Sequence, residues 1–90
     1  MHYGIELTRR ADDDLSGLPP VVASKVLDEL DELAKDPAAR SGPSHFPHLP
    51  GRQLFQTRIE AEGDVWWITV LFRYSQDERN LVILDVIATS

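Results

Sequence analysis

The strongest constraint on how this chain folds is an alternation of side chains over residues 65–74. Every second residue from Trp66 to Tyr74 is bulky and apolar, and the residues between them include Thr69 and Arg73. Side chains of a β-strand point alternately to its two faces, so the pattern predicts a strand with one buried face and one open face. Residues 51–60 show a similar pattern, with Phe55 and Ile59 on one face, and residues 81–87 predict a third strand after the polar loop 75–80.

Two helices are predicted ahead of these strands. Thr8 is a candidate N-cap for a first helix, which the pair Pro19 and Pro20 ends. Pro20 fits the first turn of a second helix, which is expected to end near Asp36 because Pro37 disfavours helical geometry in the residue before it. The second helix carries an apolar stripe at spacings of four and three: Val22, Val26, Leu30 and Leu33. This stripe predicts the face that packs on the sheet.

The remaining segments complete the expected order of elements. Residues 3–8 predict a short opening strand, and residues 37–51, with four prolines and two glycines, predict an irregular connection. A chain of 90 residues supports one core, so a single domain over 1–90 is expected. The predicted fold class is α+β, in the order β-α-α-β-β-β, with a helical hairpin packed on one face of a mainly antiparallel sheet.

Composition limits the classes of function. The chain has no cysteine, which excludes disulfides and thiolate metal sites, and no apolar run of the roughly 20 residues that cross a bilayer. We therefore expect a cytoplasmic protein without a membrane partner. A formal charge of −6 argues against binding nucleic acid through the total field, so any RNA contact must be local. His45 and His48 are too few for a metal site, and we expect neither metal nor cofactor.

Strand parity predicts which residues share the open face. A turn at residues 61–64 that pairs Glu60 with Val65 would place Phe55 opposite Val70 and Ile59 opposite Trp66. If Val82, Leu84 and Val86 complete the core, then Leu81, Ile83, Asp85 and Ile87 lie outside. The predicted open face holds the following residues of interest: Arg52, Gln56, Arg58, Trp67, Thr69, Arg73 and Asp85.

Two interpretations of the arginines on this face remain. In the predicted register Arg52 faces Arg73, and two guanidinium groups repel each other unless an anion or a carboxylate lies between them. The face could therefore bind an anion such as RNA phosphate. Alternatively, a guanidinium stacks on Trp67, and Arg73 forms an ion pair with Asp85 or Glu60, without any ligand.

The chain resembles a known family in the order of its elements and in two motifs. "LTRRADDDLSGLPPVVASKVLDELDELAKDP" leads into "HLPGRQLFQTRIEAEGDVWWITVLFRYS", where an arginine-bearing strand precedes a strand containing "ITVLF". This arrangement resembles the RelE/ParE superfamily of bacterial toxins, in particular its HigB-like, phage Gp49-like branch. The resemblance implies the toxin of a type II toxin-antitoxin pair, which binds a cognate antitoxin protein. It also implies a metal-independent endoribonuclease that cuts mRNA on the ribosome and so inhibits translation.

The same resemblance implies roles for individual residues. Such chemistry promotes attack of a ribose 2′-OH on the adjacent phosphate, and it needs a base, an acid and cations. Arg58 falls on a basic position of the family and is expected to stabilise phosphate charge, with Arg73 assisting from the same face. His48, or His45, is the candidate for proton transfer. The expected RNA-binding residues are Arg52, Gln56 and Trp67.

Two departures from the family pattern keep other functions open. Thr69 stands where many members have arginine, and the sequence ends at Ser90, so the C-terminal basic and aromatic residues of several relatives are expected to be missing. The missing C-terminal residues favour a ParE-like toxin that binds DNA gyrase without nuclease activity, or a degenerate module that only binds an antitoxin. Arg58, Arg73 and Trp67 on one predicted face favour RNA.

Overall fold

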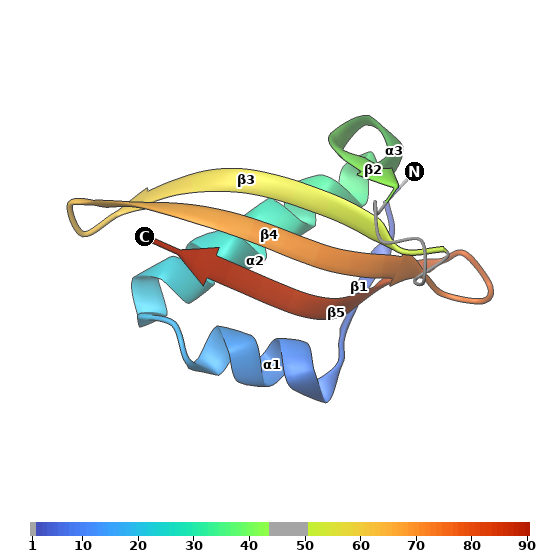
Figure 1. Cartoon of the computed structure of the whole chain (residues 1–90). Helices are drawn as coiled ribbons and strands as arrows, with labels where there is room; N and C mark the ends of the chain where they lie inside the picture. Colours follow the sequence, from blue (N-terminus) through green and yellow to red (C-terminus); the bar gives the residue numbers. More distant parts are fainter. Residues whose placement is uncertain (1, 44–50) are drawn as a thin grey trace.

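A helical layer covers one face of a five-stranded sheet in the computed structural model, which describes residues 2–43 and 51–90 (Figure 1). The sheet order is β1-β5-β4-β3-β2, with β1 parallel to β5 and all other neighbours antiparallel. The α+β class, the RelE-like order of elements and the position of the helical hairpin are as predicted. In chain order the elements are β1 Gly4–Leu7, α1 Arg9–Ser16, α2 Pro20–Lys35, α3 Pro37–Arg40, β2 Ser41–Pro43, β3 Gln53–Ala61, β4 Asp64–Tyr74 and β5 Asn80–Thr89.

The ends of both long helices follow the sequence signals. The Thr8 side chain accepts a hydrogen bond from the Ala11 N–H and caps α1, and Pro20 occupies the first turn of α2. The helix α2 ends at Lys35, two residues before Pro37. All four stripe residues of α2 are buried, and they pack with the sheet in one hydrophobic cluster. No helix among the described residues is long and apolar enough to span a membrane.

The hairpin β3–β4 has the predicted register. Glu60 pairs with Val65, and Arg58 pairs with Trp67. The predicted four-residue turn 61–64 is formed: Ala61 and Asp64 are its first and last residues and the closing pair of the strands, and Glu62 and Gly63 lie at its centre. Both central residues have positive φ, 53° and 81°, as the tight turn of a two-residue hairpin requires.

Most of the predicted core is confirmed, with two corrections. Phe55, Ile59, Ile68, Val70 and Val86 are buried. Trp66 and Leu84, which we predicted to be buried, are only half-buried. Trp66 packs against the core cluster as a partly buried residue and pairs with Ile59 near the hairpin turn.

The prediction for the faces of β5 is wrong over its first half. A register shift between Leu71 and Phe72 pairs Leu71 with Asp85 and Phe72 with Ile83, so Leu84 has no partner in β4. This β-bulge reverses the alternation, and Leu81 and Ile83 enter the main hydrophobic cluster. Val82 is buried outside that cluster, and Leu84 is half-buried. Beyond the bulge, Asp85 and Ile87 lie on the outer face as predicted.

The connection after α2 contains more regular structure than we predicted. Residues 37–40 form the short helix α3, and residues 41–43 form β2, which pairs with β3 from Phe55 to Gln53. The Asp36 side chain caps α3 by accepting a hydrogen bond from the Ala39 N–H. Proline at the first position of a helix is favourable, so a proline-rich segment did not exclude a helix here.

Candidate nucleic-acid interface

The outer face of the sheet is the face that the helices leave open. The helix α1 packs against β5 and α2 against β3, both on the inner side (Figure 1). Parity and register place a common set of side chains from β3 and β4 on the other side: Gln56, Arg58, Trp67, Thr69 and Arg73. The sequence placed all of them on this face, and the structure bears out that placement.

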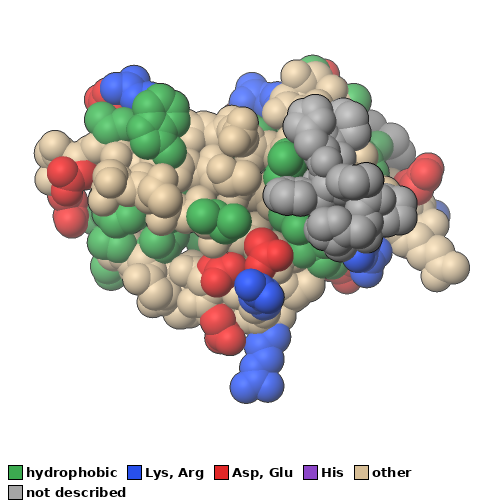
Figure 2. All heavy atoms as spheres, viewed as in Figure 1, with side chains coloured by type: hydrophobic (Ala, Val, Ile, Leu, Met, Phe, Trp, Pro, Cys, Tyr) green, Lys and Arg blue, Asp and Glu red, His purple; other side chains and the backbone are tan. Residues whose placement is uncertain are grey.

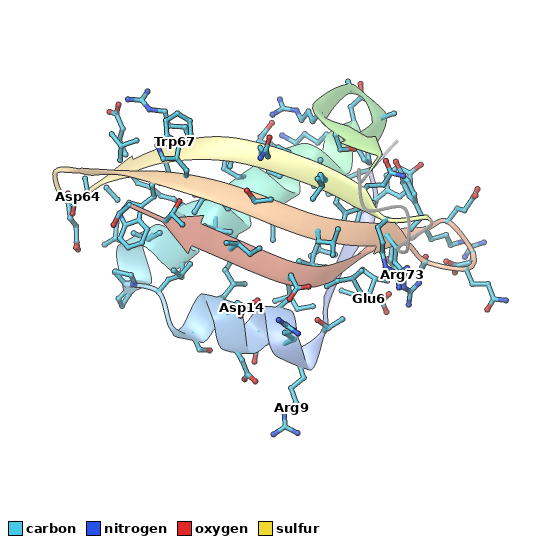
Figure 3. The ribbon with its side chains drawn as sticks, in the orientation of Figure 1. Glu6, Arg9, Asp14, Asp64, Trp67 and Arg73 are labelled. Atoms are coloured by element: carbon cyan, nitrogen blue, oxygen red, sulfur yellow. The ribbon has the colours of Figure 1, made fainter. Side chains whose placement is uncertain are left out.

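A hollow of about 320 Å³ lies on this face near the hairpin end of the sheet. Its lining residues come from the two paired strands: Gln56, Thr57, Arg58, Trp67, Ile68 and Thr69. We call it the Trp67 hollow. The indole of Trp67 is 59% exposed, which is unusual for so large an apolar side chain. Figure 3 shows it standing clear of the ribbon, and Figure 2 shows apolar atoms beside charged ones in the same place.

Arg58 is the cation of the Trp67 hollow, and it forms an ion pair. Its Nη2 lies 2.7 Å from Oε1 of Glu60, two residues along the same strand. The side chains are 53% and 68% exposed, so water and salt screen the pair, which contributes at most about 1 kcal/mol. A phosphate could replace the carboxylate at this guanidinium without a large penalty.

Arg73 lies at the opposite end of the outer face, and Arg52 precedes the first residue of β3 at that end of the sheet. Arg73 follows Trp67 by six positions in β4, which corresponds to roughly 20 Å along a strand. Arg73 is half-buried, pairs with Val82 across the sheet, and donates from Nη1 to the Tyr74 carbonyl oxygen at 3.2 Å. The expected pairing of Arg52 with Arg73 is not formed, because the β3–β4 ladder stops at Gln53 and Phe72. Arg58 and Arg73 therefore cannot contact the same phosphate.

The carboxylates considered as partners of Arg73 have other partners. Asp85 pairs with Arg10 of α1, and Glu60 pairs with Arg58. The alternative in which Arg73 is neutralised by Asp85 or Glu60 is thus wrong for both residues. The Arg58–Glu60 pair follows from strand parity, because the two residues are two positions apart on one strand and share a face.

Two pKa shifts mark the Arg73 end of the sheet. The Ser75 hydroxyl donates to Asp77 at 2.7 Å and the Arg79 N–H donates to it at 3.1 Å, which lowers the pKa of this carboxyl. Burial raises the pKa of Tyr74, and the neighbouring Tyr3 adds to the effect. The Asp77 carboxylate is bonded within the turn between β4 and β5, whereas the Tyr74 ring packs against Tyr3 and Phe72.

The two candidate histidines for proton transfer, His45 and His48, lie outside the described residues. Within residues 2–43 and 51–90, no group of three or more His, Asp or Glu side chains is arranged to hold a metal ion. Sequence reasoning missed Glu60 as the partner of Arg58, although strand parity was a sufficient signal. It also gave no role to Ile87, which pairs with Thr69 and is 57% exposed at the border of the Trp67 hollow.

Comparison with solved structures places the fold among RelE-family toxins. A chain of the toxin-antitoxin complex RelBE2 from Mycobacterium tuberculosis matches with a TM-score of 0.78 and 21% identity, over 99% of this chain and 100% of that chain. A double mutant of the Escherichia coli toxin RelE in the free state matches with a TM-score of 0.67 and 14% identity, over 96% and 82%.

The intact Escherichia coli RelBE toxin-antitoxin complex also contains a matching chain, with a TM-score of 0.64 and 13% identity, over 98% of both chains. No family model matches the sequence, and no curated protein matches it either. At these identities the likeness establishes the RelE-like fold, and function must be argued from the residues of this chain.

Proposed function

We propose that this protein is the toxin of a type II toxin-antitoxin pair and that it cleaves mRNA on the ribosome in the cytoplasm, without a metal. The observation that carries the proposal is the Trp67 hollow, where an exposed indole and an exposed guanidinium share the open face of a RelE-like sheet. Within the superfamily, the "LPG…LFQTRI" segment supports the HigB-like, phage Gp49-like branch.

Trp67 and Gln56 supply binding in this proposal. A base of the message stacks on the exposed indole, and Gln56, which is exposed on the neighbouring strand, donates or accepts hydrogen bonds at the base or ribose. Thr69 pairs with Gln56 and also lines the hollow. Arg73 and Arg52, at the far end of the face, contact phosphates further along the extended strand.

Arg58 and Glu60 supply the chemistry. Arg58 exchanges its carboxylate partner for the scissile phosphate and stabilises the negative charge that develops there. The released Glu60 carboxylate takes the proton of the ribose 2′-OH, whose oxygen then forms a bond to phosphorus as the bond to the 5′-oxygen breaks. The leaving 5′-oxygen takes a proton from His48 or, alternatively, from His45, the two candidates for proton transfer. The products are a 2′,3′-cyclic phosphate and a free 5′-hydroxyl.

The test is primer extension on mRNA from cells shortly after the protein is induced. New 5′ ends inside coding sequences are expected, and they should disappear when Arg58 is replaced by alanine. A gyrase supercoiling assay on the same purified protein is the comparison. Inhibited supercoiling with intact messages would establish the ParE-like alternative instead.

A test with a partner protein distinguishes a toxin from a degenerate module that only binds an antitoxin. We propose that a small cognate antitoxin binds this domain and restores growth when both are expressed together. Binding without any growth defect of the protein alone would identify the module that only binds an antitoxin. A neighbouring small protein that neither binds nor rescues would remove the toxin-antitoxin role.

A further inference from the structure

The side chain of Lys25 connects α2 to the strand β3. Its Nζ donates a hydrogen bond to the backbone carbonyl oxygen of Glu60 at 2.7 Å. The two-residue turn of the β3–β4 hairpin closes with a pair that exchanges both hydrogen bonds, and the pairs then alternate along the ladder. The backbone groups of Glu60, Arg58 and Gln56 therefore point to the open edge of β3, away from β4. The Lys25 ammonium group lies at this edge, beside the residue that we propose as the base.

Lys25 does not pair with the carboxylates of its own helix. Asp28 and Glu29 follow it by three and four positions, the spacings at which side chains on a helix are neighbours. Neither residue forms an ion pair with Lys25 or with any other residue in 2–43 and 51–90. An ammonium group has three N–H donors, and the Glu60 carbonyl uses one of them. Lys25 therefore keeps donors for a further acceptor close to Glu60.

Glu60 has acidic surroundings. It lines a hollow of about 280 Å³ between α2 and β3 together with two cations and two other carboxylates, and the lining residues are Lys25, Asp28, Glu29, Arg58, Ile59 and Glu60. A neighbouring hollow of about 330 Å³ adds the carboxylates of Glu62 and Asp64 beside Lys25 and Glu60. Lys25 and Arg58 are the cations that line these two hollows, and Arg58 also lines the Trp67 hollow.

Binding of a phosphate to Arg58 would leave the Glu60 carboxylate without its ion-pair partner. The phosphate brings a further negative charge close to this carboxylate, and like charges favour the protonated form of a carboxyl group. A protonated carboxyl group cannot accept the proton of the ribose 2′-OH. The reaction therefore needs a second cation in place of Arg58, and Lys25 is the other cation that lines the same hollow.

We propose that Lys25 replaces Arg58 as the partner of the Glu60 carboxylate when Arg58 binds phosphate. The ammonium group can donate to the carboxylate while it keeps its bond to the backbone carbonyl of the same residue. It then holds the carboxylate ionised at the edge of β3, and it keeps its own protons throughout. Lys25 is thus a positioning residue for the base. Its role in cleavage rests on the proposed function, whereas the exchange of partners can be measured without RNA.

A double-mutant cycle with the purified protein tests the exchange of partners. Arg58→Ala removes the competing guanidinium, and the measured quantity is the rate at which acetic anhydride acetylates each lysine, followed by mass spectrometry. An ammonium group that pairs with a carboxylate loses its proton less readily, so Arg58→Ala should slow the acetylation of Lys25 by about threefold or more. The same substitution in the Glu60→Gln background should change this rate by less than about 1.5-fold.

Lys35 is the internal control of the cycle. It pairs with Glu32 at 2.8 Å near the other end of α2, and it should react equally fast in all four proteins. An equal effect of Arg58→Ala on Lys25 in both backgrounds, or no effect in either, overturns the proposal.

Cleavage activity supplies the second arm. Lys25→Met keeps most of the length of the side chain and removes the charge. Cleavage of ribosome-bound message should fall by about tenfold at neutral pH, and the pH below which the rate declines should move upward, because the carboxylate is protonated more readily without its cation. Lys25→Arg should recover most of the rate. Lys35→Met, the matched loss of charge at the other end of α2, should leave the rate within about twofold.

The two arms separate the positioning role from the proposed function. A loss of rate in Lys25→Met that is equal at every pH would show a purely structural role and overturn the positioning role. A wild type that cleaves no message would overturn the proposed function and with it any role of Lys25 in cleavage. The acetylation cycle alone would then decide the exchange of partners.

Discussion

The two edges of the sheet are finished in different ways. On the β5 side, β1 pairs with the first four residues of the strand, and side chains of the α1 region complete the edge. The Thr8 hydroxyl donates to the Ile83 carbonyl at 2.9 Å, and Asp14 accepts the Val86 N–H at 3.0 Å. On the β3 side, β2 covers three residues, and Lys25 is the side chain that reaches the remaining edge among the described residues.

This difference suggests that the β5 side contributes mainly to stability and the β3 and β4 side mainly to function. Part-buried polar groups on the β5 side satisfy one another, so removing one leaves a partner unpaired. The β3 and β4 side carries exposed groups that the fold does not need: Arg58, Glu60 and Trp67. Substitutions on the β5 side should therefore reduce stability, and those on the β3 and β4 side should reduce activity while stability is maintained.

The largest effect is expected for Arg58→Ala. Loss of the guanidinium removes charge stabilisation in the transition state, and the cleavage rate should fall by about a hundred- to a thousandfold, or about 3 to 4 kcal/mol. The free energy of unfolding should change by less than about 0.5 kcal/mol, because the side chain is exposed. Cleavage of ribosome-bound message and urea denaturation measure the two quantities.

Arg58→Lys is the matched control for this change. Lysine keeps the charge and loses the bidentate fork that fits phosphate, so only partial recovery of the rate is expected. Full activity of the alanine variant, with circular dichroism unchanged, would remove the outer face as the functional surface and favour the protein-binding alternative.

Trp67→Ala is expected to act on binding. Loss of the stacking surface should weaken the affinity for RNA by about 1 to 3 kcal/mol, and Trp67→Phe should retain part of it. The unfolding free energy should stay within about 0.5 kcal/mol, since the indole is 59% exposed. Fluorescence titration with single-stranded RNA gives the affinity, and an unchanged dissociation constant would mean that no base stacks there.

Thr8→Ala probes the closed edge. The substitution removes the cap of α1 and the bond to the Ile83 carbonyl, and it should lower the free energy of unfolding by about 1 to 2 kcal/mol. Thr89→Ala, an exposed position near the end of β5, is the matched control and should change it by less than about 0.5 kcal/mol. Equal losses of unfolding free energy for the two variants in urea denaturation would mean that the bonds of Thr8 do not stabilise the β5 edge.

Lys25→Ala gives the corresponding test of the open edge. The lysine is exposed and its bond to the Glu60 carbonyl competes with water, so the unfolding free energy should change by less than about 0.5 kcal/mol. Exchange at the edge amides should remain fast. A loss as large as that of Thr8→Ala would mean that the β3 edge is closed as firmly as the β5 edge.

The smallest effect concerns acid stability at the β4–β5 turn. The pKa of Asp77 is lowered in the folded state, so its charge stabilises the fold above the ordinary carboxyl range, and this contribution is lost as the pH falls from about 4 through the lowered value. Asp77→Asn keeps the shape of the carboxyl and removes the charge. The difference in unfolding free energy between the two proteins should be present at neutral pH and vanish in acid, and a constant difference would contradict the assignment.

Local rules predicted much of the fold. The Thr8 cap, the limits of α2 and the register of β3 with β4 each depend on a signal within a few residues, and all three were correct. The prediction of which β5 residues point inward failed because residues 81–84 are all apolar. Alternation of polar and apolar residues therefore could not show which of them face the core, and no sign of the β-bulge is visible in the sequence. The elements α3 and β2 were missed because proline and glycine indicate turns as well as helix starts.

For the candidate site, parity predicted the face but not the distances along it. Gln56, Arg58 and Trp67 were correctly placed together, and the structure gathers them around one hollow. Arg73 shares their face at the far end of β4, which alternation alone cannot distinguish from a neighbour. The roles of these residues in binding and catalysis remain predictions.

The parallel pairing of β1 with β5 also determines when this protein can finish folding. Thr8 bonds to a carbonyl 75 residues further along the chain, so the first strand has no neighbour in the sheet until Ile83 has been synthesised. Contacts of such long range form late and slowly. During translation the hairpin β3–β4 emerges while the strand between it and β1 is still missing. The sheet is thus complete only after β5 has been synthesised.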